Sequence, residues 1–420
     1  MTLDRVIPGE PALSKELGLN GMADYRDAAY WPGKAFMAGS NPYNTPQYMT
    51  QFPTGNNFPL FSPLLMVVYG ALSLLPFNEA ASIYTAINTL LFGGLLAYSL
   101  WVTRGEVTSL SFGFLGAFLF LSQPGRACFH GGQLAAFLTL LAVISLSCST
   151  SHPRLSGTAL ALCSIKPTFG IPLGIILLAQ RRWTPLLLGW GVGAAMGILG
   201  LVIIFSQREG LSAMPQILLE NQAYLNADPD VDPRTTHVRI DSELLVLRLV
   251  PALIGHSSAM LLPLGITTVA AMLLLGPQKN TSAIVQENKP RIGLAEVFGL
   301  VTIGLSMYHL IYDALILLPA LCALAWSPSV TSELPRTRRN VVLALLCSPF
   351  INILWSPTVV SALAKLQWTT LESWTLRQGW AWEVISLLNP VAVLLAWFIL
   401  GVSLAQQHFR NTSVASKSLA

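Results

Sequence analysis

Residues 185–206 read PLLLGWGVGAAMGILGLVIIFS, a run that contains no charged side chain. As a helix, the run rises about 1.5 Å per residue, which is enough to cross the roughly 30 Å of hydrocarbon in a bilayer. Arg181 and Arg182 precede it and Arg208 follows it, so charge marks both of its ends. The stretch therefore predicts a transmembrane helix.

Similar apolar runs recur along almost the whole chain. Hydrophobic residues make up 53% of the 420, charged residues only 10%, and the mean hydropathy is +0.58. Soluble domains contain about 25% charged residues, so a water-soluble fold of this composition would precipitate. The sequence predicts an all-α, polytopic integral membrane protein with about 10 to 12 spans. The other runs lie near 60–77, 81–102, 109–122, 131–149, 155–179, 258–276, 294–308, 311–326, 340–355 and 388–405.

The basic residues predict how the chain is oriented. Short loops rich in Lys and Arg tend to face the cytoplasm, which assigns 181–182, 279–291, 336–339 and the carboxyl-terminal tail to that side. The net charge of +4 is small and scattered, so nucleic acid is not expected as a partner. We expect an external region (1–58), a transmembrane domain (59–405) with external loops near 207–248 and 356–388, and a cytoplasmic tail (406–420).

This arrangement has an odd number of spans and an external amino terminus. Residues 1–58 nevertheless resemble neither a signal peptide nor a first transmembrane helix. Three explanations stay open: a first helix is missing, the amino-terminal segment is translocated unaided, or one of the expected spans is split or merged.

The cysteines lie in or beside apolar segments without metal-ligand spacing, so we interpret them as core residues and not as a disulfide framework. The sequence contains no phosphate-binding Gly-rich loop with Lys, no dinucleotide fingerprint and no zinc spacing. We therefore expect no cofactor and no metal, and nucleotide sugars are disfavoured as direct donors. The cysteines are Cys128, Cys148, Cys163, Cys322 and Cys347.

Short motifs follow one another through the first half of the chain. The first is Asp24-Tyr25, followed by 27–30 (DAAY) and by 36–43 (FMAGSNPY), which contains a Gly-x-x-Pro-Tyr turn. A Phe58-Pro59 step then leads into 62–65 (SPLL). Together they form an Asp-aromatic pair, a small-residue segment and a proline-rich entry to the first apolar run.

The series continues in the apolar region. Gly132-Gln133 opens a span after a Pro-Gly turn, and Gly157 precedes 164–167 (SIKP) and 181–183 (RRW). A later polar break, 306–319, reads SMYHLIYDALILLP. The order of these motifs is more specific than any one of them.

From Ala23 to about Ser242, these motifs resemble glycosyltransferase family 87, the polyprenyl-phosphate-sugar-dependent membrane enzymes of the GT-C type. The sequence departs from the family pattern at Pro63, where the second proline of a Tyr-Pro-Pro segment is displaced, and at Met307, where Pro is common. Members also carry a helix before the Asp-bearing loop, and this chain shows none.

The resemblance implies a GT-C-like multi-helix bundle in the plasma membrane of the cell. It implies transfer of a mannose-like hexose or an arabinose-like pentose from a polyprenyl phosphate donor to an envelope glycan or lipid acceptor, with inversion. The expected partners are therefore that donor, a glycan or glycolipid acceptor and the lipid bilayer.

Asp24 is the expected general base, because the family's catalytic Asp stands in this Asp-aromatic pair. Such a carboxylate accepts the proton of the acceptor hydroxyl and needs hydrogen-bond reach and an ionised state. Asp27, about one helical turn further on, is the second choice. The alternative is that both are solvated or helix-capping acids of an external loop.

The leaving phosphate calls for cations near it. Lys166 stands in an apolar run beside Pro167, where it is either a buried cation facing the lipid phosphate or a structural break whose ammonium snorkels or pairs with a carbonyl. Arg239 is the best candidate of the external loop, ahead of Arg208, Arg234 and His237, although solvated loop charges are the commoner case.

Three further residues complete the expected substrate-binding set. Gln133 stands in the Gly-Gln motif, and His309 and Asp313 lie four apart, so that a helical turn would place them on one face. They then either hold a substrate or form a satisfied pair that braces the hairpin.

Two other function classes stay open. A lipid or solute transporter, or a flippase, would show inverted repeats and broken helices with ionisable groups at mid-membrane. Lys166-Pro167 fits this description in part, but the sequence shows no internal repeat. A catalytically inactive membrane scaffold is the third possibility.

Overall fold

The computed structural model describes residues 22–104, 106–207, 209–228, 232, 236, 239–250, 252, 261–275, 291–351 and 380–419. These residues form helices, and the only strand-like feature among them is one isolated bridge between Arg239 and Leu310. The predicted all-α fold is therefore confirmed.

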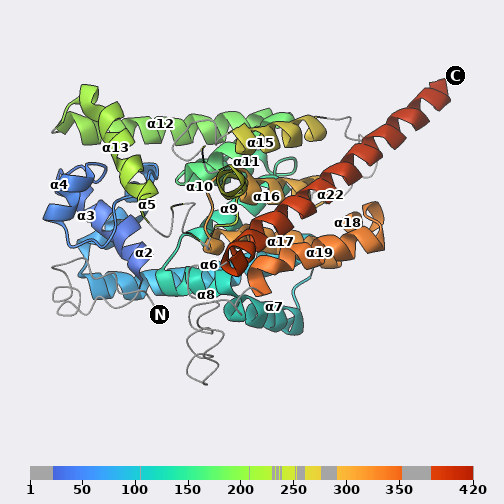
Figure 1. The fold of residues 1–420 in the computed structure, drawn as a ribbon, viewed down its shortest axis with the longest axis horizontal. Coiled ribbons are helices and arrows are strands. Elements are labelled where there is room, and N and C mark those ends of the chain that lie inside the picture. The colour runs from blue at the N-terminus through green and yellow to red at the C-terminus, as the bar shows by residue number, and fades with distance from the viewer. Residues whose placement is uncertain are drawn as a thin grey trace.

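The helices divide into short amino-terminal segments and a longer bundle (Figure 1). The short segments are α2 (Ala23–Tyr25), the π-helix η1 (Arg26–Tyr30), α3 (Trp31–Met37), α4 (Thr45–Gln51), α5 (Leu64–Tyr69) and the 3-10 helix η2 (Gly70–Leu74). The bundle contains α6 (Phe77–Arg104), α7 (Ser109–Leu121), α8 (Gln123–Gly131), α9 (Ala135–Ser147), α10 (Pro153–Cys163), α11 (Pro167–Ala179) and α12 (Trp183–Gln207). After these come η3 (Leu211–Ala213), α13 (Met214–Asn226), α14 (Ser242–Leu249), α15 (Leu261–Leu274), α16 (Leu294–Ser306), η7 (Ile311–Leu317), α17 (Leu318–Trp326), α18 (Pro328–Glu333), α19 (Arg336–Ile351) and α22 (Trp380–Leu419).

Several helices suit a bilayer. Among the described residues, α6, α12 and the Leu387–Arg410 part of α22 are each long and apolar enough to cross one. Helices α8 and α9 together pass the same test but bend by 116° where they meet. Shorter apolar helices, including α7, α11, α15 and α16, complete the bundle. The chain is thus an all-α polytopic membrane protein.

Contacts along the helices define the two ends of the bundle. Helix α6 begins near α9, since the Tyr84 hydroxyl donates to Gly132 O at 2.8 Å, and its last residue, Arg104, lies over the ring of Trp326 at 5.9 Å. In Figure 1, α2 to α5 lie at one end of the molecule and α18 lies at the other. We call these the α2 end and the α18 end.

Small residues set the closest helix contacts. A Cβ added to Gly189 of α12 would lie 2.5 Å from a methyl carbon of Leu160 in α10, and one added to Gly174 of α11 would overlap the Trp190 ring. In a bilayer, glycines let helix backbones approach closely and gain packing contacts. Gly189 and Gly193 of the 185–206 run therefore let α12 pack closely against α10.

Two expected spans differ from the observed helices. The run 155–179 is divided into α10 and α11 by 164–166, because Pro167 lacks a backbone N–H and restricts Lys166 to an extended conformation (φ −109°, ψ 104°). The run 60–77 contains only α5 and η2, which are too short to cross a bilayer. Splitting one expected span adds a crossing, and losing the other removes one. The number of crossings before α12 therefore stays the same, and so do the expected directions of the helices that follow.

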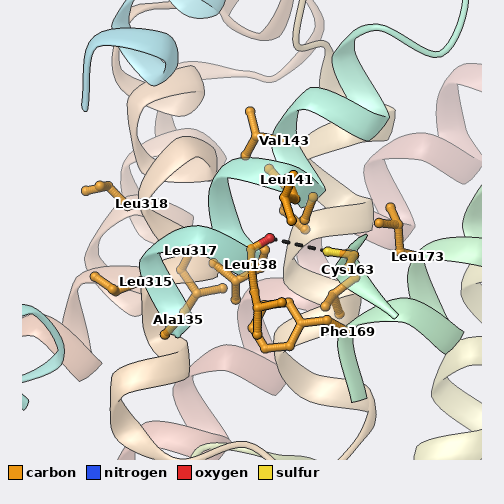
Figure 2. Close-up of a cluster of buried hydrophobic side chains, with 14 of the residues drawn as sticks. Ala135, Leu138, Leu141, Val143, Cys163, Phe169, Leu173, Leu315, Leu317 and Leu318 are labelled. Atoms are coloured by element: carbon orange, nitrogen blue, oxygen red, sulfur yellow. Dashed lines mark hydrogen bonds between the residues drawn. The ribbon is translucent and has the colours of Figure 1, made fainter. Parts of the chain in front are cut away.

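The core around the split is apolar and tightly closed. Figure 2 shows Leu138 of α9, Cys163 at the end of α10 and Phe169 of α11 converging, and the Cys163 thiol donates to Leu138 O at 3.4 Å. Four of the five cysteines are buried and Cys347 is half-buried, and all are free, as the sequence predicted. This core holds the segment that carries Lys166.

Candidate functional site

Asp24 lies against the break between α8 and α9. Its short helix is attached there by the backbone N–H of Met22, which donates to His130 O at 3.1 Å. Gly132 has a positive φ of 70°, and a Cβ added to its neighbour Gly131 would overlap a carboxylate oxygen of Asp24. Tyr25 stacks on Tyr84 with ring centroids 4.0 Å apart. The two glycines therefore let the Asp24 segment approach the break.

The Asp24 carboxyl has an unusual electrostatic environment. The residue is half-buried, and loss of water raises the pKa of its carboxyl to about 7, although a side-chain hydrogen bond with Gln133 acts in the opposite direction. Asp27 raises this pKa further, and Lys166 lowers it. Near neutral pH the group is partly ionised, which suits a group that accepts a proton during a reaction.

Asp27 has a different environment. Its two carboxylate oxygens accept hydrogen bonds from Arg26 Nε at 2.7 Å and Nη2 at 2.9 Å, and the backbone N–H of Gly55 donates to one of them at 3.2 Å. The residue is only 3% exposed. These contacts hold the segment before Phe58 against η1.

Lys166, His309 and Asp313 form a buried group of ionisable residues that joins the motif at 164–167 to the polar break at 306–319. Lys166 Nζ lies 2.5 Å from Asp313 Oδ2, and His309 Nδ1 lies 3.3 Å from the same oxygen. The expected helical turn is not what brings His309 and Asp313 together, because His309 lies in a non-helical segment before η7 and Leu310 forms the bridge to Arg239. Within the described part of the chain, His309 Nε2 and Asp313 Oδ1 are buried without a hydrogen-bond partner. These two atoms are therefore available for hydrogen bonds with a ligand.

Aromatic rings surround this group. The Phe169 ring meets the His309 ring edge-on with centroids 4.9 Å apart. Lys166 Nζ lies 5.4 Å from the centroids of both Phe169 and Tyr312, within range of a cation–π interaction. The ammonium is thus held by a carboxylate and two rings, whereas the sequence alternatives gave it a lipid phosphate, the membrane surface or a carbonyl as its partner.

Arg239 is held by acids of its own loop. Its guanidinium donates to both oxygens of Asp241, at 2.7 and 2.9 Å, and to Glu243 at 2.7 Å, and it lies 4.8 Å from the ring centroid of Tyr308. Asp241 also caps α14, and one of its oxygens accepts the backbone N–H of His309 at 3.1 Å. The loop is thereby attached to the break that carries His309. Arg208, Arg234 and His237 lie outside the described residues.

Two structural residues of the site have weak signals in the sequence. Asp241 belongs to an Asp-x-x-Leu start of a helix, a capping pattern that marks α14 but not the contact with His309. Asn221 of α13 accepts from Asn57 Nδ2 at 2.6 Å and donates to Phe58 O at 2.9 Å, which ties α13 to the segment before α5. No local pattern in α13 identifies this residue.

The structure brings most of the expected site residues together at the α2 end. Asp24 and Gln133 share a hydrogen bond, and Lys166 is close enough to lower the pKa of the Asp24 carboxyl. Lys166, His309 and Asp313 are in direct contact. Arg239 binds Asp241, which in turn accepts the backbone N–H of His309. Asp27 makes a separate set of contacts with Arg26 and Gly55.

Fold and site together define a helical membrane protein with a partly ionised carboxyl and a buried cation at one end. The sequence model of glycosyltransferase family 87 matches residues 58–283, more than half of the chain. The chain belongs to this family and is a membrane glycosyltransferase. Curated protein sequences and solved structures give no match. The matched region includes Gln133, Lys166 and Arg239, whereas Asp24 and the His309 turn lie outside it.

Proposed function

We propose that this glycosyltransferase moves a mannose-like hexose or an arabinose-like pentose from a polyprenyl phosphate donor to a glycan or glycolipid acceptor, with Asp24 as the general base. The observation that carries the proposal is the setting of Asp24. Its carboxyl is half-buried at a helix break, its pKa is about 7, and it lies close enough to Lys166 for the two charges to interact. A base and a phosphate-binding cation are the two groups that such a transfer needs.

In the proposed reaction, an acceptor hydroxyl attacks the anomeric carbon of the donor sugar. Asp24 takes the hydroxyl proton as the new C–O bond forms, and the bond between that carbon and the phosphate oxygen breaks. The phosphate leaves with the electron pair on the opposite face, so the anomeric configuration inverts. One carboxylate is sufficient for this chemistry.

The leaving phosphate is assigned to the group around Lys166. His309 Nε2 is buried and lacks a partner within the described residues, and with Nδ1 facing Asp313 it donates to a phosphate oxygen when the ring carries both protons. Lys166 supplies positive charge in a setting of low dielectric, where charge stabilisation is strong. In this scheme Asp313 positions both groups, and Arg239 holds the turn through Asp241.

The α2 end is proposed to face outward from the plasma membrane. The α18 end carries Arg336, Arg338 and Arg339, which the positive-inside rule assigns to the cytoplasm. A polyprenyl carrier keeps its chain in the bilayer while its phosphate reaches the surface, so a site at a membrane boundary suits this donor. The external face gives access to envelope acceptors.

The test is transfer of labelled sugar from polyprenyl phosphate donors in membrane vesicles that contain equal amounts of inserted protein. We expect the parent to transfer sugar and Asp24→Asn to lose at least about 99% of that rate, because proton removal by a positioned base contributes about 10²-fold or more. Glu79→Gln is the matched control, since Glu79 is an exposed acid at the start of α6. Full activity of Asp24→Asn would overturn the assignment of the base.

A transporter or flippase is the second candidate, favoured by one observation. The α8–α9 and α10–α11 breaks both lie near ionisable groups, which is typical of transport sites. Lipid flipping without sugar transfer, measured by accessibility of a labelled polyprenyl phosphate in sealed vesicles, would favour this reading. Sugar transfer that depends on Asp24 would exclude it as the main activity.

A further inference from the structure

A polar hollow of about 280 Å³ lies at the α18 end, between α18, α19 and residues 403–410 of α22. Arg336, Arg338 and Arg410 line it, and Glu333 is the only acid among the lining residues that the structure describes. The hollow is therefore basic. It lies at the opposite end of the bundle from α2 and Asp24, so it is separate from the glycosyltransferase site.

The arginines of the hollow are held in different ways. Arg338 donates to Gln406 Oε1 at 2.7 Å and to Ser403 Oγ at 3.4 Å, so it joins α19 to α22. Arg336 and Arg410 are exposed at the rim. Arg336 also begins α19, where the amide groups of the first helical turn favour an anion. The site thus combines a guanidinium that joins α19 to α22 with two exposed ones.

A second hollow of about 240 Å³ lies on the same pair of helices and shares Arg338 with the first. Its other walls come from Thr337 and Val341 of α19 and from Phe398, Ile399 and Val402 of α22. It is largely apolar and opens outward, since Val341 is 44% and Phe398 is 62% exposed. A basic hollow and an apolar groove therefore meet at Arg338.

We propose that the two hollows together bind one anionic phospholipid of the bilayer. The headgroup phosphate lies among Arg336, Arg338 and Arg410, and an acyl chain lies along the groove beside Val341 and Phe398. A soluble phosphate would use only the basic half. A zwitterionic lipid would bring its own cation toward the three arginines, which disfavours it.

The place of the site in the membrane supports this occupant. Leu387–Arg410 of α22 is a candidate span, and Arg410 is the first Lys or Arg after its apolar run. The positive-inside rule assigns the α18 end to the cytoplasmic leaflet, where anionic lipids are common and basic pockets between helices bind their headgroups. The lipid would hold α18, α19 and α22 together at that boundary.

The experiment uses the purified full chain in a neutral detergent, titrated with phosphatidylglycerol, phosphatidylcholine or inorganic phosphate. Native mass spectrometry counts the bound lipid. We expect phosphatidylglycerol to bind at least about tenfold more tightly than phosphatidylcholine. The double variant Arg336→Gln/Arg410→Gln should weaken its binding about 30-fold, which corresponds to roughly fivefold for each arginine.

Two further variants keep the test specific. Val341→Trp fills the apolar groove without changing charge and should also reduce phosphatidylglycerol binding. Arg154→Gln removes an exposed arginine of α10 that does not line the hollow, and should leave binding unchanged. Val341→Trp tests the groove even if the double variant fails to fold.

Three results would overturn the proposal. The first is equal binding of phosphatidylglycerol and phosphatidylcholine, and the second is unchanged binding by the double variant. The third is full competition by inorganic phosphate together with no effect of Val341→Trp, which would identify a site for a soluble anion. Because the site is independent of Asp24, sugar transfer is not needed to read any of these results.

Discussion

Lys166 Nζ and Asp313 Oδ2 lie 2.5 Å apart, although the two residues are separated by 147 positions in the chain. Both side chains are buried. Burying an unpaired ammonium or an unpaired carboxylate in an apolar setting raises the free energy of the folded state. The ion pair reduces this penalty for both residues. This pair connects the α10–α11 break to the turn that carries His309.

We expect that breaking this pair destabilises the protein strongly. Lys166→Met leaves Asp313 as a buried charge without its cation, and loss of one partner of a buried pair costs about 3–5 kcal/mol. The double variant Lys166→Met/Asp313→Leu should be more stable than either single variant. Melting temperatures in detergent test this. Additive losses in the double variant would show that the two residues contribute independently.

The rate of sugar transfer should depend on the ionisation of Asp24. Its pKa of about 7 means that the base is protonated at low pH, so the rate should rise with pH and level off above pH 8. Below pH 6 we expect a fall of about tenfold per unit. Initial rates between pH 5 and 9 measure the profile. A flat profile over this range would argue against Asp24 as the base.

The same carboxyl should lower stability at alkaline pH. The pKa of Asp24 is raised above its ordinary value of 3.8, so the folded state binds a proton that the unfolded state has already lost between those two pH values. Its contribution to stability is therefore greatest at low pH and is lost as pH rises through about 7. Asp24→Asn should melt higher than the parent at pH 8, and the difference should shrink toward pH 5. Glu79→Gln should show no such pH-dependent gain.

Asp27→Asn should affect stability more than chemistry. The change removes the charge that accepts hydrogen bonds from Arg26 and the backbone of Gly55, and such bonds to charged groups contribute about 1.5–3 kcal/mol each. We expect a lower melting temperature, with a transfer rate per folded molecule within about threefold of the parent. Loss of transfer by a fully folded Asp27→Asn protein would instead place Asp27 in the reaction.

Gly131→Ala should displace Asp24. The added methyl group would overlap the Asp24 carboxylate, so the segment must move away from Gln133. We expect transfer to fall at least about tenfold, since small displacements of catalytic groups are costly. Gly191→Ala is the matched control, because a Cβ there meets no atom within 4 Å and alanine favours the helix. Equal activity of the two variants would contradict the proposed placement.

The residues that sequence patterns identify well are those whose signal is local. The uncharged run 185–206 corresponds to α12. His309 and Asp313 are in contact, but without the helical turn on which the expectation from their spacing rested. The lengths of the spans near 60–77 and 155–179 were wrong. Hydropathy alone does not show that Pro167 divides one run or that Ser73 and Leu75 pack against η1 and α3.

The sequence by itself determined the class of this protein, because hydropathy and charge are summed over neighbouring residues and a bilayer accepts only long apolar helices. It also determined the family, whose sequence model matches residues 58–283, a region that contains the Ser164 to Pro167 motif. Only the tertiary structure decided which acid is partly ionised and which is fixed in salt bridges. The pKa of Asp24 and the pairing of Lys166 with Asp313 depend on burial and on partners far away in the chain, and neither is encoded in any local pattern.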